Sequence, residues 1–121
     1  MGIVKVKRVY EPAEKTDGIR ILVDRLWPRG LSKEHAKLDY WLKHLGPSTS
    51  LRKWFNHEED KFTDFKHKYI HELQSGEQQK AYRELETIIT KAASQNVTLL
   101  FAARNERCNH VQVLKELIDK S

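Results

Sequence analysis

Residues 97–103 of the chain read VTLLFAA. This run is the strongest strand signal in the sequence, and because it is apolar on both faces it predicts a central strand inside a sheet. A helix is expected after it, since Val111, Leu114 and Leu117 recur at helical spacing. A buried strand followed by an amphipathic helix is typical of α/β proteins.

Two more strands are expected in the first third of the chain. Residues 3–10 alternate apolar and basic side chains, and residues 19–26, IRILVDRL, form a mostly apolar run after a turn at residues 16–18. The second run ends at residues 27–30, WPRG, because proline lacks the N–H needed for pairing and glycine permits a turn.

The segment between the second and third strands is expected to be helical. Four apolar stripes at helical spacing mark it: Leu38, Trp41, Leu42 and Leu45 after a Ser32 cap; Leu51, Trp54 and Phe55; Phe62, Phe65, Tyr69 and Leu73; Ala81, Leu85, Ile88 and Ala92. We expect Trp41, Leu42, Trp54 and Phe65 in the core. The order of elements predicts an α/β fold, a small three-layer sandwich with a mostly parallel sheet and a helical middle section, formed by one domain of residues 1–121.

Composition narrows the class of partner only slightly. The chain has 121 residues and a formal net charge of +5, which favours an anionic partner weakly because basic and acidic residues alternate, as in residues 58–61. The lone Cys108 cannot form an internal disulfide and indicates a reducing compartment, so we expect a cytoplasmic protein. No stretch resembles a secretion signal or a membrane span, so no membrane partner is expected.

Charged side chains directly follow the second and third expected strands. Arg25 lies at the end of the second strand, Arg29 follows it, and Arg104 comes after the third. Because ligands of parallel α/β sheets bind beyond the carboxyl ends of the strands, we expect these arginines to converge on one anion-binding site, with Trp27 beside them. Structural roles are the alternative: Arg25 paired with Asp24 or Glu106, Arg29 solvated, and Trp27 packed as a lid over the core.

His110 and Asp24 are the candidate catalytic residues. His110 projects with the inner stripe at the start of the last helix, where it acts as a general acid or base or, alternatively, as a core histidine bonded to a carbonyl. Cys108 lies near the same helix start, where a thiolate is favoured, although a small packed residue is the alternative. His67 and His71 project toward solvent without a third ligand, so no metal is expected, and no cofactor-binding motif is present.

Three segments resemble a known family: residues 17–31 (DGIRILVDRLWPRGL), 38–55 (LDYWLKHLGPSTSLRKWF) and 97–118 (VTLLFAARNERCNHVQVLKELI). They are similar to the uncharacterised YeaO-like family, domain of unknown function 488, over nearly the whole chain. The resemblance implies a small α/β domain with no established reaction. The broader family carries a Cys-His-Arg motif near the last helix, which Cys108-Asn109-His110 only approximates. The resemblance adds weight to six site candidates: Asp24, Arg25, Trp27, Arg29, Arg104 and His110.

These observations predict a basic pocket for a phosphorylated small molecule, a nucleotide or a nucleic-acid end. In a hydrolytic version, the arginines neutralise developing charge, Asp24 or His110 moves a proton, and Trp27 shapes the pocket. The alternative is a non-catalytic nucleic-acid-binding or interaction module, in which Trp27 or Trp54 stacks bases. The sequence leaves open whether the protein is an enzyme and what its oligomeric state is.

Overall fold

The computed structural model describes residues 2–120, which form an α/β fold around a four-stranded sheet in the order β1-β4-β2-β3. The strands are β1 (Val4–Arg8), β2 (Ile19–Leu22), β3 (Tyr40–Trp41) and β4 (Val97–Phe101). Every pairing is parallel, and β4 pairs with β1 on one side and with β2 on the other. The prediction of a mostly parallel sheet with residues 97–101 at its centre is confirmed.

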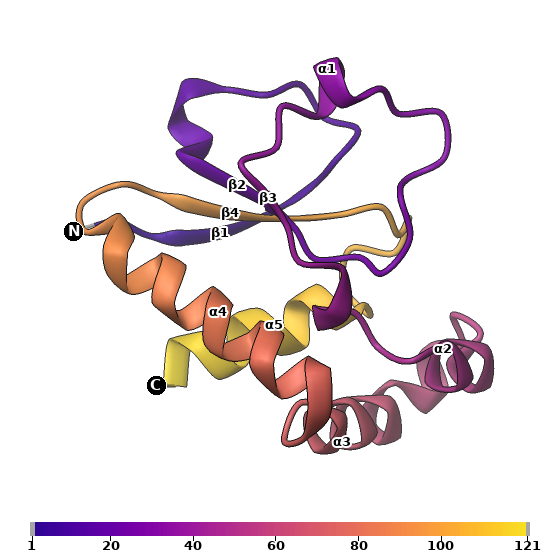
Figure 1. Cartoon of the computed structure of the whole chain (residues 1–121). Coiled ribbons are helices and arrows are strands. Elements are labelled where there is room, and N and C mark those ends of the chain that lie inside the picture. The colour runs from indigo at the N-terminus through magenta and orange to yellow at the C-terminus, as the bar shows by residue number, and fades with distance from the viewer. Residues whose placement is uncertain (1, 121) are drawn as a thin grey trace.

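Helices cover one face of this sheet. They are α2 (Thr49–Phe55), α3 (Phe62–Glu72), α4 (Gly76–Ala92) and α5 (His110–Lys120). Figure 1 shows α4 and α5 beneath the strands, while α2 and α3 lie toward one end of the layer. Val97, Leu99 and Phe101 of β4 point into this core, where they pack with Leu85 of α4 and Leu114 of α5. No helix within residues 2–120 has both the length and the apolar character that crossing a bilayer requires.

The other face is covered by chain connections rather than by long helices. The 3-10 helix η1 (Lys15–Asp17) joins β1 to β2, and the one-turn helix α1 (Lys33–Ala36) lies between β2 and β3, above the sheet in Figure 1. The third layer of the sandwich is therefore thin. A small cluster of Val9, Leu22 and Leu100 fills the space beneath it, with Trp27 packed against them.

A buried ionic network occupies the rest of this face. The Asp17 carboxylate is 1% exposed and accepts hydrogen bonds from Arg20 Nη1, from Lys7 Nζ at 3.1 Å and from the Glu14 backbone N–H at 3.0 Å. Burial alone would raise the pKa of Asp17, but these hydrogen bonds outweigh it and hold the pKa below its ordinary value. Thr98 of β4 donates to the Asp17 backbone carbonyl at 2.7 Å, so the network ties three strands together.

The helix predicted through residues 38–45 is wrong. Helix α1 ends at Ala36, where Lys37 adopts a left-handed conformation with φ 47°. Tyr40 and Trp41 then pair with β2 as the short edge strand β3. The physical reason is that β2 would otherwise carry unpaired backbone groups along its open edge, and pairing outweighs the helical spacing of the apolar side chains. The 3-10 helices η2 (Lys43–Leu45) and η3 (Glu59–Lys61) complete the chain's elements.

The predicted core is confirmed at Leu42 and Phe65, which are buried, and is wrong at Trp41 and Trp54, which are 38% and 37% exposed. Trp41 lies on the edge strand, where one side of the chain meets solvent. On the two-turn helix α2, Phe55 faces the core and Trp54, one position earlier, is rotated by about 100° toward the surface.

Candidate functional site

A cavity of about 810 Å³ opens at the carboxyl ends of β2 and β4, bounded by α2 and by the start of α5. We call it the strand-end cavity. Four of the six sequence-predicted site residues line it: Asp24, Arg25, Arg104 and His110. Its position is the one that parallel α/β sheets commonly use for ligands, because loops from several strands meet there.

Four cationic side chains line the strand-end cavity. Arg25 and Arg104 were expected there, and Arg52 and Lys53 of α2 join them, facing Asp24 as the single carboxylate of the lining. Sequence reasoning missed the α2 pair. The one available signal was an Arg-Lys step beside a buried apolar residue, which does not show where the helix lies relative to the sheet.

Arg25 combines a structural role with its place in the lining. Its Nε donates to the Pro47 carbonyl and its Nη2 to the Gly46 carbonyl, both at 3.0 Å. A Cβ at Gly46 would lie 2.8 Å from the Arg25 backbone nitrogen, so glycine is required for this close approach. Arg25 therefore has a structural role, but its partners are the carbonyls of residues 46–47 and not the expected Asp24 or Glu106.

Arg104 and Arg52 retain hydrogen-bonding capacity for a ligand. Arg104 is exposed, and within residues 2–120 no group accepts a hydrogen bond from it. Arg52 donates from Nη2 to Thr49 Oγ1 at 3.3 Å, while its buried Nε has no hydrogen-bond partner among the described residues. A guanidinium with unused donors beside a cavity is suited to binding a phosphate or carboxylate.

Asp24 and His110 form a pair at the inner end of the cavity. The His110 Nε2 lies 3.2 Å from Asp24 Oδ1 and 3.1 Å from the Val23 carbonyl oxygen. Asp24 Oδ2 accepts the Ala102 backbone N–H at 3.0 Å, which links the end of β2 to the end of β4. Tyr69 packs edge-on against the His110 ring with centroids 6.0 Å apart. Asp24 Oδ1 is buried and has no hydrogen-bond partner among the described residues, so the carboxylate is anchored to the chain through Oδ2 alone.

Side chains at and just before the start of α5 accept hydrogen bonds from nearby backbone N–H groups. Asn109 Oδ1 accepts the Gln112 backbone N–H at 3.1 Å, and Asn105 Oδ1 accepts those of Arg107 and Cys108 at 2.9 and 3.0 Å. Asn109 caps α5 and uses one of its first N–H groups before any ligand arrives, while Asn105 orders the loop that precedes the helix.

The surroundings of Cys108 do not favour its thiolate form. Burial, followed by the negative charge of Glu59, raises the pKa of its thiol above the ordinary value. His67 and His71 are exposed on α3, and no cluster of three metal-ligating side chains occurs within residues 2–120.

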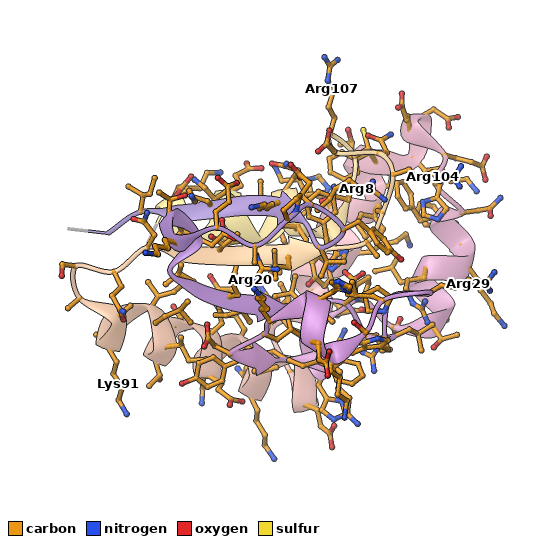
Figure 2. All side chains as sticks on the ribbon, turned by 90° about the horizontal axis from the view of Figure 1, so that it is seen from above. Arg8, Arg20, Arg29, Lys91, Arg104 and Arg107 are labelled. Atoms are coloured by element: carbon orange, nitrogen blue, oxygen red, sulfur yellow. The ribbon has the colours of Figure 1, made fainter. Side chains whose placement is uncertain are left out.

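Two sequence-predicted residues lie outside the lining of the strand-end cavity. Trp27 donates from Nε1 to the Leu31 carbonyl at 2.7 Å and packs edge-to-face on Trp41, so it covers the small cluster beneath the third layer. Arg29 is exposed at the same end of the sheet as Arg104 in Figure 2, but it does not line the cavity. Arg107, in the loop before α5, points into solvent in that view.

The cavity wall also contains a strained segment. Asn56 and His57, which end α2 and line the cavity, have φ values of 46° and 56°. Two consecutive residues other than glycine in the left-handed region are uncommon, and such backbone strain concentrates at functional sites.

Comparison with known proteins places the chain in a family. A family model described as "Inactive DUF488-N3 subclade" matches residues 3–121. The chain belongs to this subclade. The uncharacterised protein YeaO of Escherichia coli (strain K12) is 45% identical over 113 residues, which are 93% of this chain and 94% of YeaO. The resemblance to the YeaO-like family seen in the sequence is confirmed.

More distant relatives match over the same extent. An uncharacterised protein of Mycobacterium tuberculosis (strain ATCC 25618 / H37Rv) is 35% identical over 116 residues, which are 96% of this chain and 93% of that protein. An uncharacterised protein of Mycobacterium bovis matches with the same figures. No solved structure matches the chain.

Proposed function

We propose that the protein binds the phosphate group of a nucleotide, of another phosphorylated small molecule or of a nucleic-acid end in the strand-end cavity, and holds it without chemical turnover. The observation that carries this proposal is the meeting of Arg25, Arg52, Lys53 and Arg104 around one cavity. Four cations against one carboxylate produce a positive potential that attracts a phosphate.

The size and walls of the cavity support a ligand larger than a bare anion. About 810 Å³ lies within the range of roughly 300–1,000 Å³ that is usual for small-molecule sites. Leu26 is 62% exposed and supplies apolar surface beside the cations, whereas Phe55 and Phe65 of the lining are buried. A sugar or base could pack on Leu26 while its phosphate contacts the guanidinium groups.

Binding without turnover is favoured by the state of the reactive groups. The His110 Nε2 already lies against the Val23 carbonyl and Asp24, so this nitrogen is engaged by the chain. The Cys108 thiol has a raised pKa and stays protonated at neutral pH. The subclade to which the chain belongs is itself described as inactive. Each of these points argues against the hydrolytic role that the sequence left open.

The test is a calorimetric titration with inorganic phosphate, nucleoside 5′-monophosphates and a 5′-phosphorylated oligonucleotide. Arg52→Ala and Arg104→Ala should each weaken binding about tenfold or more, since a hydrogen bond to a charged group contributes about 1.5–3 kcal/mol. Arg29→Ala is the matched control and should bind like the parent, because Arg29 is exposed and outside the lining.

Three results would contradict the proposal. Equal affinities for the parent, Arg52→Ala and Arg104→Ala would remove the strand-end cavity from binding. Release of inorganic phosphate from a bound nucleotide, followed by phosphorus NMR and abolished by Asp24→Asn or His110→Gln, would make the protein a hydrolase instead. Absence of any phosphate ligand would favour an interaction module whose arginines are structural.

A further inference from the structure

The segment that leaves β4 is held at the end of β1 through three successive backbone carbonyls. The Phe101 carbonyl accepts the Val9 backbone N–H at 2.8 Å. The carbonyls of Ala102 and Ala103 accept hydrogen bonds from Nη2 and Nε of Arg8, each at 3.0 Å. One guanidinium group therefore turns two neighbouring carbonyls in the same direction, whereas successive carbonyls of a regular strand alternate between its two sides.

The backbone N–H groups of this segment point the opposite way. No cis peptide bond occurs within residues 2–120, and in a trans peptide the N–H lies opposite the carbonyl that precedes it. The N–H groups of Ala102, Ala103 and Arg104 therefore all project away from the end of β1. The N–H of Ala102 donates to Asp24 Oδ2 at 3.0 Å, whereas those of Ala103 and Arg104 have no acceptor among the described residues.

This row of N–H groups adjoins the strand-end cavity. Ala103 and Arg104 line the cavity together with Asp24. Arg8 does not line it, although Figure 2 shows Arg8 and Arg104 at the same end of the molecule. Successive N–H groups on one side of a turn form a nest, whose partial positive charges bind an anion. A carboxylate already occupies the first N–H of the row, and the next two are left for a ligand.

We propose that the backbone N–H groups of Ala103 and Arg104 form an anion nest for one oxygen of the bound phosphate group, and that Arg8 is the positioning residue that assembles it. The inference rests on the proposed function and adds fixed backbone donors to the cationic side chains of the cavity. Phosphate is tetrahedral, so one oxygen can lie on the nest while others contact the guanidinium groups of Arg52 and Arg104.

The experiment follows the backbone amides of the whole chain by proton–nitrogen NMR during titration with inorganic phosphate, with the affinity measured by calorimetry. The amide protons of Ala103 and Arg104 should move downfield on saturation, because each gains a hydrogen bond to an anion. The amide of Ala102 is the internal control. It is already bonded to Asp24 and should move less.

A substitution at Ala103 tests the nest directly. Ala103→Pro removes one N–H and should weaken phosphate binding about tenfold or more, since a hydrogen bond to a charged group is lost. Ala103→Gly is the matched control, because it also removes the side chain but keeps the N–H. It should change the affinity by less than about threefold.

A substitution at Arg8 tests the positioning role and serves if Ala103→Pro fails to fold. Arg8→Lys keeps the charge but loses the planar fork that holds two carbonyls at once. It should weaken phosphate binding about fivefold or more and reduce the downfield movement of the Ala103 and Arg104 amides. A residue that only stabilised the fold would leave that movement unchanged. Arg83→Lys is the matched control and should bind like the parent, because Arg83 is exposed on α4 and outside the lining.

The outcomes separate the two proposals. Phosphate binding in which the amides of Ala103 and Arg104 move no more than that of Ala102 would overturn the nest and leave the cationic cavity standing. Parent-like affinity in Ala103→Pro or in Arg8→Lys would overturn it as well. Failure of inorganic phosphate and of every phosphorylated ligand to bind the parent would instead refute the proposed function.

Discussion

Asp17→Asn should destabilise the protein by about 3–5 kcal/mol, because it leaves buried cations without their counter-ion. The side chains of Arg20 and Lys7 are 5% and 11% exposed, and both donate hydrogen bonds to the Asp17 carboxylate. Asparagine has nearly the same shape, so little packing is lost and the effect is electrostatic. For a chain of 121 residues, this loss corresponds to a fall in Tm of about 10–20 °C.

The pH dependence gives the prediction a second signature. The pKa of Asp17 is lower in the folded protein than its ordinary value of 3.8. A lowered folded pKa means that the stabilisation is fully present above the unfolded value and is lost as pH falls through the folded value. The difference in stability between parent and Asp17→Asn should therefore be constant from about pH 5 to 7 and shrink in acid below 3.8.

The measurement is urea unfolding followed by tryptophan fluorescence at several pH values. Asp119→Asn is the matched control, because Asp119 pairs with Lys115 at the surface with a 55% exposed side chain, and its loss should be hard to detect. A value for Asp17→Asn within 1 kcal/mol of the parent, or a stability difference that persists unchanged at pH 2, would refute the reasoning.

Three further predictions concern packing and reactivity. Trp54→Ala should cost about 1 kcal/mol or less in urea unfolding, whereas Phe65→Ala, which empties a fully buried position, should cost about 3–5 kcal/mol; equal losses would show that Trp54 is core after all. Tyr69→Phe should cost about 1 kcal/mol, since its buried hydroxyl donates to the Leu45 carbonyl. Because burial raises the pKa of Tyr69 above its ordinary value, its phenolate should form at higher pH in the native than in the urea-unfolded protein, and identical titration in the two states would count against this. Cys108 should react with a thiol reagent more slowly in the native than in the urea-unfolded protein, in keeping with its raised pKa, and equal rates would contradict it.

The hydrophobic pattern of the sequence predicted the structure correctly where the environment of a residue depends on its neighbours in the chain. The apolar run at residues 97–101 predicts a strand buried on both faces, and the structure places it between β1 and β2. The two stripes that contain Phe65 on α3 and Leu85 on α4 also lie inside, because the apolar face of an amphipathic helix packs toward the core.

The hydrophobic pattern gave a wrong prediction where a strand distant in the sequence decided the backbone conformation. Trp41 repeats at helical spacing with Leu38 and Leu45, yet residues 40–41 form a strand because the open edge of β2 offers backbone hydrogen bonds. Helical spacing measures only how apolar side chains are arranged. It carries no information about which backbone groups elsewhere in the fold still lack partners.

Half of the candidate site followed from the sequence, because strand ends of a parallel sheet gather at one edge. That rule brought Asp24, Arg25 and His110 to the strand-end cavity, although they come from segments about 85 residues apart. It could not bring Arg52 there, since the position of α2 depends on how the helices pack against one another. The sequence by itself determined the layers and the edge where a ligand would bind, through local hydrophobic periodicity. Only the tertiary structure decided which charges face that edge, because the docking of helices is set by long-range shape and contact.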